Sequence, residues 1–106
     1  MEFGEALEIV KDGGMIHREG WNGKDLFVFR QVPAEINVET IVPKMQSLPN
    51  KVKAVFMNRL ETRHFPSIFY HDQLALVDFD NNITGWSPST ADALATDWGK
   101  YINTKE

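Results

Sequence analysis

The dipeptide Asn22-Gly23 stands between two extended segments rich in apolar residues, 15–21 and 26–32. Both residues tolerate positive φ, so the pair is typical of the tight turn of a β-hairpin. Because a hairpin makes its strands antiparallel neighbours, this turn limits the kind of sheet that can grow from it. The sequence therefore predicts a β-hairpin over residues 15–32.

Three segments have the spacing of amphipathic helices, with apolar residues at i, i+3, i+4 and i+7. The first covers residues 3–10 and is stopped by Gly13-Gly14. A second, short helix is expected after Pro49. The third is expected to run from Ser89 along an apolar stripe to Trp98 and to close at Gly99.

The remaining segments are extended or irregular. Residues 68–79 are expected to form one long strand or two short ones, and residues 83–86 a brief last strand. Residues 33–66 contain a loop with one helical turn near Pro43 and form a variable insertion. The order of elements shows no βαβ alternation, which favours an α+β fold with a small, mainly antiparallel sheet and two or three short helices. One domain over residues 1–106 is expected, with 101–106 as a tail.

Composition excludes several classes of function. Eleven Lys and Arg stand against fifteen Asp and Glu, so the formal net charge is −4, which argues against a general DNA or RNA binder. The chain has no cysteine, so disulfides, thiolate zinc sites and cysteine nucleophiles are excluded. No apolar run approaches the length of a membrane span, and no signal peptide is evident. We expect a protein of the cytosol without membrane contact.

No catalytic or metal-binding motif is evident. The three histidines, His17, His64 and His71, lack metal-ligand spacing. The segment 85–89 resembles a nucleophile elbow but has serine in place of the last glycine and a proline after the candidate serine. We therefore predict no catalytic residue, no metal site and no cofactor.

Two tryptophans beside glycine-marked turns are candidates for ligand binding. Trp21 follows Gly20, and Trp86 follows Gly85. An indole at the end of a strand can stack on a purine base. The alternative is that both side chains belong to the core or to a subunit interface. Trp98, on the apolar stripe of the expected last helix, is assigned to the core.

The start of the expected last helix is a candidate anion site. Its first N–H groups lack helical partners, and Ser87, Ser89 and Thr90 add hydroxyl donors there. The alternative is ordinary capping, since Ser89 and Asp92 have capping-box spacing. Asp92 can also accept hydrogen bonds from ribose hydroxyls.

Two residues of the expected hairpin are further candidates. Arg18 is the cation expected nearest the site, although an ion pair with Glu19 or Glu5 is the alternative. Asn22 can use its amide on a ligand or only to form the turn.

Three motifs in this order resemble a family of small phage and prophage proteins that includes the Thoeris anti-defence proteins of the second type. They are Phe3-Gly4-Glu5-Ala6-Leu7, Arg18-Glu19-Gly20-Trp21-Asn22-Gly23, and Ile83 to Asp92 followed by Asp97-Trp98. The resemblance spans essentially the whole chain. Residues 33–66 are longer than the shortest members need, so ligand choice can differ here.

The resemblance implies a non-enzymatic protein that binds and sequesters a nucleotide-derived immune signal. The implied ligand is a cyclic ADP-ribose isomer, with cyclic oligonucleotides as a further class, and the implied place is the cytoplasm of a bacterial host. The resemblance also implies homo-oligomers, tetramers or dimers, with pockets between subunits. Carried over by motif, the ligand-binding residues are Trp21, Asn22, Trp86, Ser87, Ser89, Thr90 and Asp92, with Phe3 and Arg18 beside them.

Two other classes of function stay open. One is an enzyme acting on a nucleotide, with Asp72, Asp78, Asp92 or His71 as acid or base. The other is a phage structural or interaction protein in which Trp21 and Trp86 fill a subunit interface.

Overall fold

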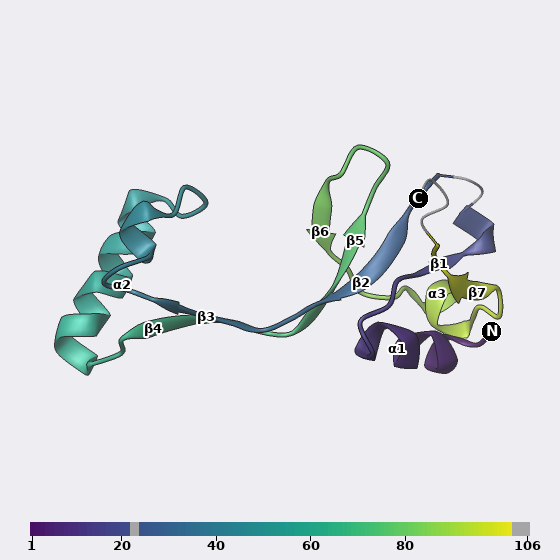
Figure 1. Cartoon of the computed structure of the whole chain (residues 1–106), viewed down its shortest axis with the longest axis horizontal. Coiled ribbons are helices and arrows are strands. Elements are labelled where there is room, and N and C mark those ends of the chain that lie inside the picture. The colour runs from purple at the N-terminus through teal and green to yellow at the C-terminus, as the bar shows by residue number, and fades with distance from the viewer. Residues whose placement is uncertain (22–23, 103–106) are drawn as a thin grey trace. The chain divides into compact units, whose positions relative to one another are not determined.

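The computed structural model describes residues 1–21 and 24–102 of the chain. These residues form two compact units, one made of Met1–Val32 with Asp72–Glu106 and the other of Pro33–His71. Figure 1 shows the helices and strands of each unit. The expected α+β class with a mainly antiparallel sheet is confirmed.

The first unit is a five-stranded sheet with two helices. Its strands are β1 (Ile16–Arg18), β2 (Phe27–Gln31), β5 (Gln73–Val77), β6 (Ile83–Gly85) and β7 (Trp98–Lys100), and its helices are α1 (Phe3–Lys11) and α3 (Thr90–Leu94). The strand order is β6-β5-β2-β1-β7, and every neighbouring pair is antiparallel. The turn of the predicted hairpin, Asn22-Gly23, lies outside the described residues, but its strands do pair, with Ile16 opposite Val28.

Helix α1 covers one face of this sheet. Its residues Ala6 and Val10 are fully buried with Ile16 and Val28 from the strands, and Trp98 completes this core. Two glycines end the helix: Gly13 adopts a positive φ of 91°, and the N–H of Gly14 donates to the carbonyl oxygen of Ile9 at 2.9 Å.

The second unit contains β3 (Ala34–Asn37), the 3₁₀ turn η2 (Val42–Lys44), α2 (Asn50–Arg63) and β4 (Ser67–Tyr70). Strands β3 and β4 pair antiparallel in a separate two-stranded sheet. Helix α2 has no buried residue, and the buried side chains of the unit are Val38 and Val42. The predicted turn near Pro43 and the predicted helix after Pro49 are confirmed, whereas β3 was expected to be loop.

The last helix is shorter than the sequence predicts. Helix α3 ends at Leu94, and Ala95 already has an extended backbone with ψ of 147°. Trp98 lies on β7, where it pairs with Arg18 of β1, and Gly99 is a strand residue rather than the end of a helix. Trp98 has the spacing of a helical stripe, but it is buried as a strand residue. Tertiary packing therefore overrides the local pattern. The assignment of Trp98 to the core is confirmed, since the residue is 3% exposed.

The first strand of the hairpin is shorter than expected. Strand β1 ends at Arg18, and Glu19–Trp21 form the 3₁₀ turn η1. The N–H groups of Glu19 and Gly20 both donate to Asp97, at 3.1 Å to its carbonyl oxygen and 2.8 Å to its carboxylate. These bonds divert the backbone from the ladder, so Trp21 lies in a turn rather than on a strand.

Candidate functional site

Three aromatic side chains surround the buried indole of Trp98. The ring centroids of Phe3, Trp21 and Trp86 lie 5.3, 5.4 and 6.0 Å from that of Trp98. Trp21 and Trp86 meet Trp98 edge to face, with interplanar angles of 81° and 78°, an arrangement that aromatic quadrupoles favour. We call these four residues the aromatic cluster.

The outer members of the aromatic cluster are only partly buried. Phe3, Trp21 and Trp86 pack against the core formed by α1 and the sheet, but each retains exposed surface. The two interpretations of the tryptophans therefore meet in one arrangement: each ring packs against the core and retains some exposed surface. An accessible indole held in place by the core can offer a stacking surface without a large ordering cost.

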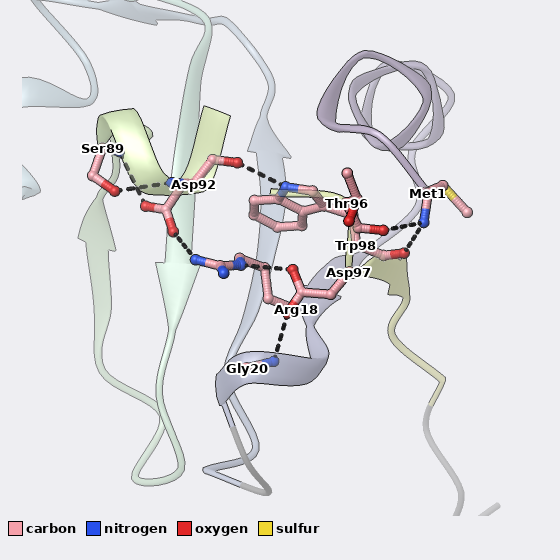
Figure 2. A network of polar contacts seen from close by, with 8 residues as sticks. All are labelled: Met1, Arg18, Gly20, Ser89, Asp92, Thr96, Asp97 and Trp98. Atoms are coloured by element: carbon pink, nitrogen blue, oxygen red, sulfur yellow. Dashed lines mark hydrogen bonds and ion pairs between the residues drawn. The ribbon is translucent and has the colours of Figure 1, made fainter. Parts of the chain in front are cut away.

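Arg18 lies between two carboxylates beside the aromatic cluster. Its Nη1 donates to Asp92 and its Nε to Asp97, both at 2.9 Å (Figure 2). Asp97 also accepts from the N–H of Gly20. We call Arg18, Asp92, Asp97 and Gly20 the Arg18 network. The alternative prediction, an ion pair of Arg18 with Glu19 or Glu5, is wrong: among the described residues Arg18 pairs with Asp92 and Asp97.

Hydrogen bonding sets the charge state of this network. The hydrogen bond to Asp97, followed by that to Asp92, raises the pKa of Arg18 above its ordinary value. The guanidinium and the N–H of Gly20 lower the pKa of Asp97. Burial alone would raise the pKa of Asp92, but hydrogen bonds from Ser89 and Arg18 outweigh it and the pKa is lowered. All three groups are therefore charged at neutral pH, and the trio carries one net negative charge.

Asp92 also takes part in capping the N-terminus of α3. Ser89 is the N-cap residue: its Oγ accepts from the N–H of Asp92 at 3.1 Å, and its own N–H donates to the Asp92 carboxylate at 3.0 Å. The predicted capping box is confirmed. Helix α3 has five residues, and the bonds of the box use donors that the sequence interpretation had offered to an anion.

Two further hydroxyls, those of Ser87 and Thr90, flank the cap. Ser87 and Thr90 are exposed, and neither side chain makes a hydrogen bond to the part of the chain that the structure describes. They lie on either side of the cap, directly after Trp86 and at the first residue of α3. Within residues 1–21 and 24–102 no partner uses these two hydroxyls, so they can donate to a ligand.

The structure thus brings together most of the residues that the sequence selects. Phe3, Arg18, Trp21 and Trp86 converge on Trp98 and Asp92, whereas Asn22 lies outside the described residues. Sequence reasoning missed Asp97 and Gly20 as parts of the site. The adjacency of Asp97 to Trp98 in the third motif was the available signal.

The remaining candidate acids lie apart from the aromatic cluster. Asp72 accepts from Arg30 at 2.8 Å, and this hydrogen bond lowers its pKa. The N–H of Asn82, followed by its side chain, lowers the pKa of Asp78 in the turn between β5 and β6. Within residues 1–21 and 24–102 no group of three His, Asp or Glu side chains is placed to hold a metal ion, and no helix is long and apolar enough to cross a bilayer.

Comparison with known proteins assigns the family. The sequence model of the Thoeris anti-defense 2-like domain matches residues 1–100. A protein of Bacillus phage SP01 named Thoeris anti-defense 2 is 33% identical over 98 residues, which cover 92% of this chain and 91% of that protein. The chain therefore belongs to the Thoeris anti-defense 2-like family, and its role is anti-defence.

Proposed function

We propose that this chain acts by binding a nucleotide-derived immune signal and sequestering it, without catalysis. The proposed ligand is a cyclic ADP-ribose isomer, with cyclic oligonucleotides as a second class. The observation that carries the proposal is the pair of partly exposed indoles, Trp21 and Trp86, whose rings pack nearly perpendicular to that of buried Trp98. Such surfaces suit a purine, and base stacking on an aromatic side chain is worth about 1–3 kcal/mol per base.

The charge states of the candidate acids support a binder over an enzyme. A general acid or base works best with a pKa near the operating pH. Asp72, Asp78 and Asp92 all have their pKa lowered by hydrogen bonds, which moves them away from that range. Each accepts bonds from its own fold, so none is poised to take a proton from a substrate.

The Arg18 network shapes how phosphates would be held. Because Asp92 and Asp97 neutralise Arg18, a diphosphate gains little from this cation. We assign the phosphates instead to the hydroxyls of Ser87 and Thr90. The ribose hydroxyls are assigned to the Asp92 carboxylate, whose two oxygens accept from Arg18 and from the N–H of Ser89 and keep further lone pairs. Polar contacts of this kind suit a ligand that must be held without a basic cluster, in a chain of net charge −4.

We further propose that the chain functions as a homo-oligomer, a dimer or tetramer, with a second subunit closing the pocket over the aromatic cluster. Trp21 and Trp86 are partly exposed in the single chain, so a second surface is needed to exclude water from a tightly held ligand. Sequestration requires slow release, and burying most of the ligand favours it. The proposed site of action is the cytoplasm of the bacterial host, where the signal is made.

Isothermal titration calorimetry on the purified full chain tests the ligand. Cyclic ADP-ribose isomers, cyclic dinucleotides and cyclic trinucleotides are titrated separately, with linear ADP-ribose as the matched control. Bound ligand is then released by heat and identified by mass spectrometry. We expect saturable binding of a cyclic species that is recovered intact. Absence of binding to every cyclic species, or recovery of a hydrolysed product, overturns the proposal.

A further inference from the structure

The two partly exposed indoles of the aromatic cluster are held by different kinds of contact. Trp86 directly follows β6, and its main-chain N–H donates to the carbonyl oxygen of Leu74 at 2.9 Å, which continues the ladder between β5 and β6. Trp21 instead ends η1, a 3₁₀ turn whose three residues all retain exposed surface. Short 3₁₀ turns have poor hydrogen-bond geometry. The position of Trp21 therefore depends on contacts from outside η1.

Asp97 supplies two of these contacts. Its carbonyl oxygen accepts from the N–H of Glu19 at 3.1 Å, and its Oδ2 accepts from the N–H of Gly20 at 2.8 Å. Figure 2 shows the carboxylate between Gly20 and Arg18. The two bonds reach the two residues directly before Trp21, so they fix the direction in which the chain enters that residue.

Both oxygens of the Asp97 carboxylate are used. Oδ1 accepts from Nε of Arg18 at 2.9 Å, while Oδ2 accepts from Gly20. Hydrogen bonds to a carboxylate are charge-assisted and stronger than those between neutral groups. The side chain is 27% exposed, so salt screens these bonds less than at a fully exposed position. An amide side chain offers one oxygen and one NH₂ group, so asparagine at this position would leave one of the two donors without an acceptor.

Gly20 fits closely against this carboxylate. A Cβ at this position would lie 3.1 Å from Oδ2 of Asp97 and 3.5 Å from Nη2 of Arg18, and the first distance is shorter than an ordinary van der Waals contact. A side chain would therefore push η1 away from the carboxylate. The absence of a side chain at Gly20 lets the turn approach within hydrogen-bond distance.

Asp97 is itself anchored by its neighbour in the sequence. Trp98 is 3% exposed, its backbone pairs with Arg18 across β7 and β1, and its indole N–H donates to the carbonyl oxygen of Asp92. The dipeptide Asp97-Trp98 thus supplies both the buried ring of the aromatic cluster and the carboxylate that holds η1. The ring centroids of Trp21 and Trp98 lie 5.4 Å apart, so a movement of η1 would change this contact.

We propose that Asp97 is a positioning residue: its carboxylate, by binding Gly20, holds the indole of Trp21 in place before a ligand arrives. A ring that is already ordered loses little side-chain freedom on binding. Asp97 therefore raises the affinity for a ligand without touching it. The effect of Asp97 on affinity rests on the proposed function, whereas its effect on the indole does not.

Nitrogen-15 relaxation of the indole and backbone N–H groups, in the full chain without ligand, tests the effect on the ring. Asp97→Ala removes the carboxylate but keeps the main-chain carbonyl and buried Trp98, so it should fold, which circular dichroism checks. We expect the order parameter of the Trp21 indole to fall, while those of Trp86 and Trp98 stay at their wild-type values. The backbone order parameter of Gly20 should fall from the rigid value of about 0.85 toward the flexible range below about 0.6.

Three further variants complete the series. Asp97→Asn retains one acceptor and should restore part of the order. Gly20→Ala pushes η1 from the other side and should loosen the Trp21 indole as Asp97→Ala does. Asp72→Ala is the matched control, because it removes the carboxylate from the ion pair with Arg30, and it should leave all three indoles unchanged. If Asp97→Ala does not fold, Asp97→Asn and Gly20→Ala carry the test.

Calorimetry with a cyclic ADP-ribose isomer measures the effect on binding. Asp97→Ala should weaken binding by about twofold to tenfold, the cost of ordering one side chain, and Asp72→Ala should bind as the wild type does. In a Trp21→Ala background Asp97→Ala should cause almost no further loss, because it acts through the indole. A residue that only stabilised the fold would lower the affinity by the same factor in both backgrounds.

Three results would overturn the inference. They are a Trp21 indole as ordered in folded Asp97→Ala as in the wild type, an equal loosening of all three indoles, and a loss of affinity that persists in full when Trp21 is replaced. A loosened indole with unchanged affinity overturns the role of Asp97 in binding. A wild type that binds no cyclic species removes the proposed ligand, and the relaxation measurements still decide whether Asp97 holds the ring.

Discussion

The indole N–H of Trp98 donates a 2.9 Å hydrogen bond to the main-chain carbonyl oxygen of Asp92. The carboxylate of the same Asp92 accepts from Arg18, and Arg18 pairs with Trp98 across β1 and β7. Strand β1 is therefore tied at one point to α3 and β7, which follow one another near the other end of the chain (Figure 2). The candidate site is built on the core, so the effect of a substitution on stability must be separated from its effect on ligand binding.

Trp98→Ala should cost most of the stability of the first unit. The indole is 3% exposed and contacts three aromatic rings, and large-to-alanine changes of this kind lower the free energy of unfolding by about 3–5 kcal/mol. Urea unfolding followed by tryptophan fluorescence and circular dichroism measures the loss. Leu94→Ala, at an exposed position of α3, should change it by no more than about 0.5 kcal/mol. A loss for Trp98→Ala as small as that of the control would contradict its place in the core.

The Arg18 network predicts a definite pH dependence. In the folded chain the pKa values of Asp97 and Asp92 lie below their ordinary value of about 3.9. A lowered pKa contributes stability above the unfolded value, and this contribution is lost as the pH falls through the folded pKa. Arg18→Gln should therefore be less stable than the wild type near neutral pH, and the difference should shrink below about pH 4.

Urea unfolding of both proteins across this pH range measures that difference. Arg30→Gln is the matched control, because among the described residues Arg30 forms an ion pair with one carboxylate, that of Asp72, at a more exposed position. Its effect near neutral pH should be smaller than that of Arg18→Gln, since one exposed ion pair contributes little. A difference between wild type and Arg18→Gln that stays constant down to low pH would show that the carboxylates do not depend on Arg18.

Helix α1, the hairpin strands and the start of α3 could be predicted from the sequence because their signals are local. Helix α1 needed only its apolar spacing and the glycines at its end, and the hairpin strands needed only their apolar runs around a turn. The capping box of Ser89 and Asp92 is likewise a signal of three residues. Each of these depends on contacts between residues close in the chain.

The features that sequence reasoning missed depend on distant partners. Strand β3 forms because Ile36 pairs with Ile68, although all of α2 lies between the two in the sequence. Nothing local distinguishes this strand from a loop. Strand β7 forms because Trp98 pairs with Arg18, which ends the helical pattern early. The second partner of Arg18, Asp97, lies 79 residues away along the chain. Nothing in a single sequence indicates that positions so far apart form a pair.

Ser89→Ala and Ser87→Ala should separate capping from ligand contact. Ser89 caps α3, and loss of an N-cap side chain costs about 0.5–2 kcal/mol of stability. Ser87 is exposed and its hydroxyl is unused within the described residues, so Ser87→Ala should leave the free energy of unfolding nearly unchanged while weakening binding of the cyclic ligand. Thermal unfolding and calorimetry on the two variants measure both effects. If Ser87→Ala binds as the wild type does, its hydroxyl has no part in holding the phosphates.

Trp86→Ala should weaken ligand binding by about fivefold to a hundredfold, because it removes one stacking surface worth about 1–3 kcal/mol. Phe79→Ala is the matched control: it removes an aromatic ring that is 74% exposed in the turn between β5 and β6, and it should bind as the wild type does. Trp86 also packs against the core, so Trp86→Phe is measured beside it and should retain part of the affinity at nearly full stability.

Calorimetry gives the affinities, and light scattering on the same samples gives the mass. A variant that changes mass while the affinity per site stays the same would place Trp86 in a subunit contact. An unchanged mass with weaker binding would place it against the ligand.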